Sequence, residues 1–404
     1  MPSGAHVYCG HVSGKSEQMP ILSPAFARVA IANFCFFLTF ASFFLLPLHV
    51  RDLGGSERTV GFVMGTNGVA GLVSVFLLGP VLDRFDRRLF LRAGLAVMLL
   101  ATLGYLAVDR IGPLLFALRV VQGVAFAAGF NAASTLAAEL APPTRRAAAL
   151  GIFGVSTLGT HALAPTIGEQ LIRIGGFDLL FVVAAAYSVV GLVLTIGLPP
   201  SDVSGRRGSV RLQVTRGLQA TIAVVGMAGI AFGTVITFMP TFVRHDALLG
   251  SVSTFFLTYT GAAIGTRFVA AGLGDTFGHR RVVVPSLTVL GLSIAALATV
   301  HSVAALAMVG AVFGTAQGIV YPTLNAYAIE QAPVGQFGRL QTLFNGAFNL
   351  GVTTGSFALG TIADAYGHRP VFLCAAATAL MAVALFVTAT TNKRAAHDGG
   401  APHA

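Results

Sequence analysis

Residues 79–88 read GPVLDRFDRR, and residues 271–280 read AGLGDTFGHR. Each is a short charged segment between two long apolar runs. Asp83 and Asp275 stand 192 positions apart. The same offset of 192 relates three further pairs: Phe85 and Phe277, Arg88 and Arg280, and Gly168 and Gly360. A constant offset over this distance predicts one unit of roughly 190 residues that is used twice, a period too long for a solenoid.

The composition indicates a membrane protein. Of the 404 residues, 55% are apolar and only 10% are charged, with a mean hydropathy of +0.80. A soluble domain carries about 25% charged residues, so too few are present here to cover a water-facing surface. Apolar runs of 18 or more residues, each long enough to cross a ~30 Å hydrocarbon core as a helix, recur about a dozen times. Internal duplication in such a chain is typical of transporters.

Several function classes are excluded by what the sequence contains. The formal charge of +10 does not indicate a nucleic-acid partner, because the arginines fall in predicted loops, where they set topology. The three cysteines, Cys9, Cys35 and Cys374, have neither paired nor metal-type spacing. No H-E-x-x-H, G-x-S-x-G or Walker-type run occurs. We therefore expect no cofactor, no metal site, no enzymatic activity and no ATP-driven pump.

The expected fold is an all-α membrane protein with twelve transmembrane helices in two pseudo-symmetric six-helix bundles. The bundles cover residues 22–198 and 218–390. The other segments are a disordered N-terminal tail (1–21), a cytoplasmic linker (199–217) and a C-terminal tail (391–404). The predicted helices cover about 26–48, 59–78, 89–108, 113–138, 147–171, 177–198, 218–242, 252–273, 282–300, 303–328, 339–362 and 370–390.

The distribution of Lys and Arg predicts the orientation. If both termini face the cytoplasm, seventeen of these residues lie on the cytoplasmic side and six on the other. The remaining two, Arg119 and Arg267, fall inside predicted helices. Basic loops stay in the cytoplasm, so the count places both termini, the linker and both charged segments there.

The first charged segment resembles G-x-x-x-D-R-x-G-R-R, the loop between helices 2 and 3 of the major facilitator superfamily. The residues that match are Gly79, Asp83, Arg84, Arg87 and Arg88. The second segment matches at Asp275, Gly278, Arg280 and Arg281, with Arg267 eight residues before the Asp, as the family often has it. Arg119, Gln122 and Gly123 resemble the family's R-x-x-Q-G. The resemblance covers about residues 22–390. It implies a monomer in the bacterial inner membrane with a small-molecule substrate.

By this resemblance the two charged segments form a latch that holds the cytoplasmic gate shut. Gly79 allows two helices to approach closely. Asp83 is expected to pair with loop arginines and with the positive N-terminus of a helix from the other half. Asp86 stands where the family has Gly, and Asp adopts left-handed geometry less readily, so the turn is expected to differ. Gly360, Asp364, Gly367 and Arg369 repeat the pattern on the opposite side, where we expect a structural role.

Ionisable groups inside a membrane cost about 2.5–3.5 kcal/mol on insertion scales, so each is a functional candidate. No carboxylate is expected at mid-membrane, and Glu169 is expected near a helix end. The ionisable candidates within the predicted helices are therefore Arg119, His161, Glu169 and Arg267. If the turn after helix 4 centres near residue 143, Arg119 lies close to the level of Glu169. We therefore expect an Arg119–Glu169 ion pair, either functional or purely structural.

His161 is the only histidine expected at mid-membrane, and an intrinsic pKa near 6.5 suits a proton carrier. The alternative is a neutral histidine that is hydrogen-bonded within the bundle. Arg267 is expected to support helix packing or the gate. The remaining pathway candidates are polar residues that could line a cavity or serve only as interhelical hydrogen-bond partners: Asn33, Gln122, Asn131, Tyr259, Gln317, Tyr321, Asn345 and Asn349.

The resemblance extends to the twelve-helix drug and sugar efflux branch, whose members exchange substrate for protons. Gly151 and Pro165 fit the antiporter motif G-x8-G-x3-G-P-x3-G, whereas Thr160, Ala164 and Glu169 stand where it has Gly. The leading expectation is therefore an exporter of small organic molecules driven by the proton gradient, with Glu169 and Arg119 favoured over His161 for coupling. The alternative is an importer, symporter or facilitator with the same fold.

The latch makes the first testable prediction. Asp83→Asn keeps the shape of the side chain and removes the charge that pairs with arginine and a helix end, so transport should fall severely while the protein still inserts. Flux per inserted molecule in proteoliposomes measures this. Near-normal flux in correctly inserted protein would contradict it.

Overall fold

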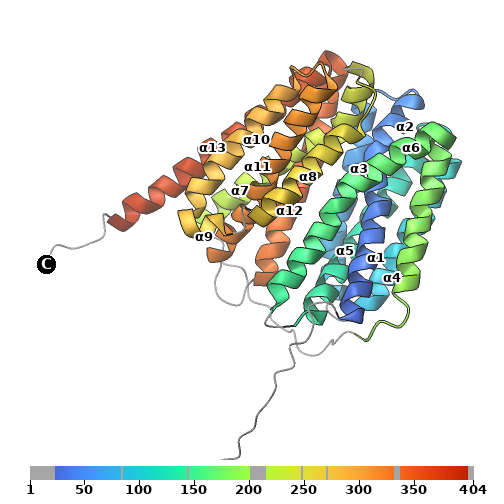
Figure 1. Cartoon of the computed structure of the whole chain (residues 1–404), viewed down its shortest axis with the longest axis horizontal. Helices are drawn as coiled ribbons and strands as arrows, with labels where there is room; N and C mark the ends of the chain where they lie inside the picture. Colours follow the sequence, from blue (N-terminus) through green and yellow to red (C-terminus); the bar gives the residue numbers. More distant parts are fainter. Residues whose placement is uncertain are drawn as a thin grey trace, which may run out of the picture.

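The computed structural model describes residues 23–82, 85–142, 145–200, 215–246, 249–269, 272–331 and 337–398. Helices form almost all of this part of the chain, which contains no strand. Figure 1 shows two groups of helices side by side, one coloured blue to green and one yellow to red. We call them the N-half (residues 23–200) and the C-half (residues 215–398). The predicted tail 1–21, most of the linker, Asp83 and Arg84 lie outside the described residues.

The helices of the N-half begin where the local sequence supplies caps. Ser23 Oγ accepts a hydrogen bond of 3.1 Å from Phe26 N, and Pro24 occupies the first helical position. Asp86 caps the fourth helix by accepting from Arg88 N at 2.9 Å. The elements are α1 (Pro24–Ser42), η1 (Phe43–Leu45), α2 (Leu46–Asp52), α3 (Glu57–Leu82), α4 (Arg87–Gly104), η2 (Tyr105–Ala107), α5 (Pro113–Leu140) and α6 (Arg146–Leu194). Asp86 has φ −60°, so this helix cap needs no left-handed residue.

The 49 residues of α6 are about twice the number that cross a membrane once. The helix is interrupted at Gly175 and Gly176, and Gly176 has φ +70°, which glycine adopts without steric cost. Helical segments therefore lie on both sides of the break, close to the predicted ranges 147–171 and 177–198.

The C-half repeats the N-half. The starts of α1 and α7 are 192 residues apart, and so are those of α4 and α10. Its elements are α7 (Arg216–Thr241), the short π-helix η4 (Phe242–Asp246), α8 (Ser253–Val269), α9 (Leu273–Phe277), α10 (His279–Leu297), α11 (Val303–Glu330), α12 (Phe337–Tyr366) and α13 (His368–Asp398). The last helix continues beyond residue 390, the predicted end of the final span.

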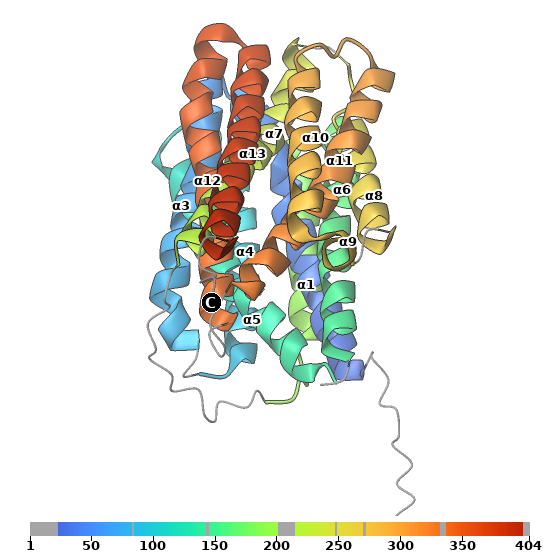
Figure 2. The same ribbon diagram turned by 90° about the vertical axis from the view of Figure 1, so that its left-hand side faces the viewer.

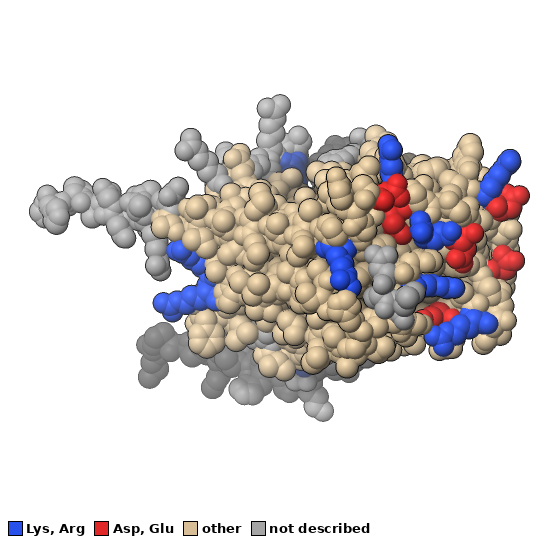
Figure 3. Space-filling view, turned by 90° about the horizontal axis from the view of Figure 1, so that it is seen from above, with Lys and Arg blue, Asp and Glu red and all other residues tan. Residues whose placement is uncertain are grey.

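Eight helices in the described ranges are long and apolar enough to cross a membrane. They lie within Pro24–Asp52, Arg87–Ala107, Pro113–Leu140, Ala148–Leu194, Gly217–His245, His279–Leu297, Val303–Glu330 and His368–Thr391. The all-α membrane fold is thereby confirmed, and the count of twelve spans stays a prediction. Figure 3 shows uncharged residues over the broad middle of one face, with the acidic side chains gathered toward one end.

The halves meet along two helix pairs, α3 with α12 and α6 with α8 (Figure 2). The offset of 192 residues relates α3 to α8 and α6 to α12. The α3–α12 pair therefore corresponds to the α8–α6 pair when the two halves are exchanged. We call the end where α3 begins at Glu57 the distal end, and the end where α3 leads into α4 the motif end.

Small residues let α3 and α12 approach closely. A Cβ on Gly61 would lie 2.4 Å from Ser356 O, and one on Gly68 would lie 2.0 Å from Thr353 Oγ1. A Cβ on Gly360 would lie 3.0 Å from Glu57 O, so this glycine of the repeated loop pattern packs at the interface. Such contacts are typical of helix association in membranes, which depends on close packing.

The close approach of α3 and α12 makes the second prediction. Gly61→Val forces a side chain against the Ser356 carbonyl, so it should destabilise this conformation by about 1–3 kcal/mol. The thermal unfolding midpoint in detergent, followed by circular dichroism, measures the effect. Gly261→Val is the matched control, because Gly261 is also helical and faces open space. Equal unfolding midpoints for the two variants would contradict the prediction.

Candidate functional site

The candidate site is the interface between α6 and α8, which run antiparallel with contacts at three levels. At the distal end Glu169 meets the start of α8. In the middle His161 meets Tyr259. Toward the motif end, Arg267 Nη1 lies 3.9 Å from the position that a Cβ on Gly154 would take. The polar residues of both halves are thus arranged along one line through the protein.

Glu169 caps the N-terminus of a helix that belongs to the other half. Its carboxylate accepts from Ser253 N at 3.1 Å, from Ser253 Oγ at 2.7 Å and from Val252 N at 3.2 Å. Ser253 is the first residue of α8, whose first N–H groups have no partner within the helix. An ionised carboxylate at this position is stabilised by both hydrogen bonds and the helix dipole. Arg173 adds a contact of 3.4 Å to Glu169 and donates to Gly250 O.

A second polar contact joins the halves at the distal end. Glu57 accepts from Thr241 Oγ1 at 3.1 Å and lies 3.2 Å from His368 Nε2. Glu57 and His368 are 5% and 2% exposed, so this pair is shielded from water. Arg51 Nε lies 3.4 Å from the other carboxylate oxygen. The predicted site did not include Glu57 and His368, because both begin helices beside predicted loops, where charges are ordinarily solvated.

A cavity of about 310 Å³ lies beside Glu169 at the distal end. Its lining comes from both halves: Leu45, Leu48, Glu169, Ile172, Arg173, Arg244, Gly250 and Val252. The volume is sufficient for water, and the wall carries one carboxylate and two guanidinium groups. The cavity therefore gives Glu169 a polar surrounding on the side away from α8.

The middle level is a single hydrogen bond between the halves. His161 Nδ1 lies 3.2 Å from Tyr259 Oη. The ring of Phe44 meets His161 edge-on at 5.1 Å and stacks on Phe256 at 5.7 Å. These aromatic rings separate His161 from the distal contacts.

Arg267 lies two helical turns from Tyr259 on α8, toward the motif end. The electrostatic neighbours of its guanidinium are the hydroxyls of Tyr259 and Tyr321. Its Nε is buried without an acceptor, and it has no carboxylate partner among the described residues. The structure thus places Arg267 in the interface between the halves.

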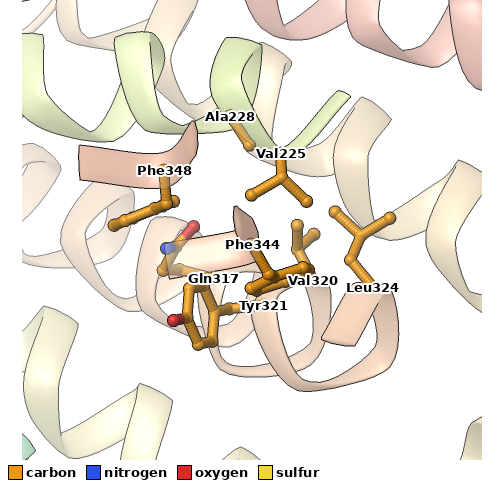
Figure 4. Close-up of a pocket in the computed structure, with 8 residues that line it drawn as sticks. All are labelled: Val225, Ala228, Gln317, Val320, Tyr321, Leu324, Phe344 and Phe348. Atoms are coloured by element: carbon orange, nitrogen blue, oxygen red, sulfur yellow. The ribbon is translucent and has the colours of Figure 1, made fainter. Parts of the chain in front are cut away.

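The C-half contains a ladder of polar side chains between α11 and α12. Tyr321 Oη donates a hydrogen bond of 2.5 Å to Asn345 Oδ1. Asn325 and Gln341 exchange two amide hydrogen bonds of 2.8 and 3.0 Å. Figure 4 shows the pocket next to this ladder, lined by Val225, Ala228, Gln317, Val320, Tyr321, Leu324, Phe344 and Phe348. Its wall is apolar and aromatic apart from Gln317 and Tyr321.

Comparison with known proteins identifies the family. The model of the Major Facilitator Superfamily matches residues 29–248 and again residues 221–403. The chain belongs to the Major Facilitator Superfamily.

Relatives of similar length include an efflux pump, an export protein and a multidrug resistance protein. The multi-drug resistance efflux pump PmrA of Streptococcus pneumoniae is 26% identical over 89% of this chain and 96% of its own. The staphylopine export protein of Staphylococcus aureus is 24% identical over 86% and 91%. The multidrug resistance protein MdtG of Dickeya zeae is 25% identical over 86% and 90%.

Solved structures share the fold. The nucleoside transporter NupG superposes with a TM-score of 0.73 at 15% identity, covering 90% of this chain and 99% of its own. A POT family transporter superposes with a TM-score of 0.75 at 14% identity, covering 91% and 96%.

The expected Arg119–Glu169 ion pair is wrong in this conformation of the Major Facilitator Superfamily fold. Arg119 donates instead to Val63 O at 3.1 Å and to Gln122 Oε1 at 2.9 Å. Tyr105 donates to the same oxygen at 3.0 Å. The two predicted partners lie on neighbouring helices, but Arg119 turns toward α3 whereas Glu169 turns toward α8. Arg119 and Gln122 therefore hold elements of the N-half together.

Two other predicted pathway residues also make contacts within the N-half. Asn33 donates to Thr157 Oγ1 at 2.8 Å, which joins α1 to α6. Asn131 donates to Ala127 O of its own helix. In the C-half, Asn349 is exposed on α12, one helical turn from Asn345. The structure thus brings His161, Tyr259 and Arg267 together, whereas Asn33 and Asn131 make other contacts.

The family's latch motif is described in part. Arg87 forms an ion pair with Glu139, and Arg88 binds Asp86 at 2.5 Å and Leu198 O at 2.6 Å. In the second segment Gly278 has φ +86°, which favours glycine, just before α10 begins. Asp83 and Arg84 lie outside the described residues, and the side chain of Asp275 and the surroundings of Gly79 are not described. Arg281 is exposed and Arg280 is half-buried. Arg280 donates to Thr391 Oγ1 at 3.1 Å. The described residues contain no group of three metal-ligating side chains.

The contacts of Glu169 make the third prediction, tested by double-mutant cycles on unfolding in detergent. Because Arg119 and Glu169 have separate partners, the free-energy effects of Arg119→Gln and Glu169→Gln should add within about 0.5 kcal/mol. Glu169→Gln and Ser253→Ala remove parts of one contact, so their effects should differ from the sum by more than about 0.5 kcal/mol. Coupling between positions 119 and 169, with none between 169 and 253, would reverse this assignment.

Proposed function

We propose that this protein exports a small organic molecule across the bacterial inner membrane by alternating access, as a monomer, in exchange for protons. The observation that carries the proposal is the pair of charged contacts that join the halves at the distal end. Glu169 holds α8, and Glu57 holds Thr241 and His368. Each is a discrete polar contact between two helical bundles, so rocking of the bundles would break it and re-form it.

The direction is supported by two independent observations. The excess of Lys and Arg beside the motif end favours a cytoplasmic position for that end and an outward position for the distal end. The conformation is then one with its outer side closed. Two relatives, at 26% and 24% identity, are named as an efflux pump and an export protein.

Proton exchange is proposed through ionisable groups at these contacts. Protonation of Glu169 would remove the charge that binds the N-terminus of α8, and the adjacent cavity supplies a water route to it. The Glu57–His368 contact is strongest when the carboxylate is ionised and the imidazole is protonated. His161 is the third candidate, because it sits between the halves at mid-depth. The partner of Glu169 in this mechanism is Arg173 rather than Arg119.

An importer, symporter or facilitator of the same fold is the second candidate. It is favoured by the position of the carboxylates, because Glu57 and Glu169 both lie toward the distal end, whereas His161 lies in the middle of the interface and Arg267 toward the motif end. A facilitator needs no group that titrates within reach of both sides.

The fourth prediction is measured as flux driven by a pH gradient in proteoliposomes across a panel of organic compounds. The wild type should accumulate substrate against its gradient, because proton exchange supplies the energy. Glu169→Gln and His368→Gln should each lower gradient-driven accumulation about tenfold or more, with downhill flux reduced less. His161→Ala tests the remaining candidate.

Asp364→Asn serves as the control, since Asp364 is an exposed carboxylate near the distal end of α12. If Glu169→Gln, His368→Gln and His161→Ala all retain accumulation, none of these residues couples transport to protons. Downhill flux alone in the wild type would identify a facilitator.

A further inference from the structure

We propose that the cargo is an organic anion with an apolar ring, whose negative group binds Arg267 and whose ring enters the pocket between α7, α11 and α12. This inference rests on the proposed function, because a bound anion is a cargo only if the protein is a transporter. The binding site itself stands on the structure alone.

The charge argument concerns Arg267. Arg267 is half-buried, and its Nε is buried without an acceptor. A cation inside the membrane without a counter-ion is unfavourable, so it is retained where an anion pairs with it in part of the working cycle. The other arginine inside the bundle, Arg119, has neutral acceptors and lies inside the N-half. Glu169 binds the opposite end of α8, fourteen residues from Arg267. An anionic ligand would therefore supply the charge that the described residues do not supply.

The position of Arg267 relative to the pocket follows from helix register. The helices α8 and α11 run parallel, and a Cβ on Gly314 would touch Tyr259 while one on Gly318 would touch Ala263. Both pairs differ by 55 in residue number, so Arg267 lies level with residue 322, next to Tyr321. Tyr321 is also an electrostatic neighbour of the guanidinium and part of the pocket wall. Arg267 thus stands at the edge of the pocket.

The pocket offers contacts that suit a ring with an N–H group. Phe344 and Phe348 flank Tyr321, with ring centroids 5.3 and 5.1 Å from it. Gln317 is 8% exposed, and its Oε1 is buried without a donor. Figure 4 shows Gln317 beside Tyr321 and Phe348.

The ladder between α11 and α12 explains why this amide is free. Tyr321 is hydrogen-bonded to Asn345, and Asn325 to Gln341. Because α11 and α12 run antiparallel here, the next pair along the two helices is Gln317 and residue 349. Asn349 is exposed, and Gln317 Oε1 has no hydrogen-bond donor, so this oxygen can accept from a ligand N–H. In this conformation the pocket is a narrow crevice, and a ring would enter as Tyr321 swings away from Asn345.

Three probes that share the indole ring system and differ in charge test the proposal: indole-3-acetate, indole-3-acetamide and tryptamine. Equilibrium binding of radiolabelled probes to the purified full-length protein in lipid nanodiscs should favour the acetate over the amide by about tenfold or more, with tryptamine weakest. Arg267→Gln should reduce the preference for the acetate to within about threefold, and Arg267→Lys should keep part of it. Gln317→Leu should weaken all three probes alike, because each carries the same indole N–H.

Arg58→Gln is the matched control, since it removes an exposed arginine of the N-half that contacts only the face of Phe62 among the described contacts. Size-exclusion profiles confirm that each variant is folded. The proposal is overturned if the amide or tryptamine binds as tightly as the acetate, if Arg267→Gln keeps the preference, or if the acetate does not bind at about 1 mM.

Flux in proteoliposomes separates this inference from the proposed function. Binding of the acetate without flux of any probe would end the export proposal and leave the anion site intact. Flux of tryptamine in preference to the acetate would support transport and overturn the anion site.

Discussion

The contact of a carboxylate with the N-terminus of a helix from the other half organises this protein. Glu169 accepts from two backbone N–H groups at the start of α8, where such groups have no partner within the helix, and also from the Ser253 hydroxyl. Because the contact is charge-assisted and local, it is strong when the halves are together and is lost as a unit when they part. The buried Glu57–His368 contact joins α3 to the first residue of α13 and is a second charged contact between the halves.

The contacts inside each half differ in kind from the contacts between the halves. Arg119, Gln122 and Tyr105 tie α5 to its neighbours, and Asn33 ties α1 to α6, through buried hydrogen bonds that do not cross the interface. At the interface, small residues such as Gly61 and Gly68 bring α3 within backbone distance of α12. The rings of Phe62 and Phe357 add an apolar contact between α3 and α12, with centroids 5.3 Å apart. Such close packing is typical of helix association in membranes.

The distribution of charge along α8 links gate and cargo. The helix begins at the carboxylate of Glu169 and is hydrogen-bonded to His161 through Tyr259. Near its end lies Arg267, which has no carboxylate partner in the part of the chain that the structure describes. An anion at Arg267 and a proton at Glu169 or His368 would therefore act on one rigid element. This arrangement gives a physical route by which cargo and proton occupancy influence the same motion.

The sequence by itself determined the duplicated all-helical membrane fold and the family, because apolar run length and the offset of 192 residues depend only on positions along the chain. It also identified His161, Tyr259 and Arg267 as candidates, since polar groups inside apolar runs are conspicuous. It could not assign their partners. Helix register places Arg119 near the level of Glu169, but each residue turns by about 100° around its helix, and packing alone decides which way a side chain points. Glu57 and His368 were missed for the related reason that only the tertiary structure shows a helix end to be buried against the other half.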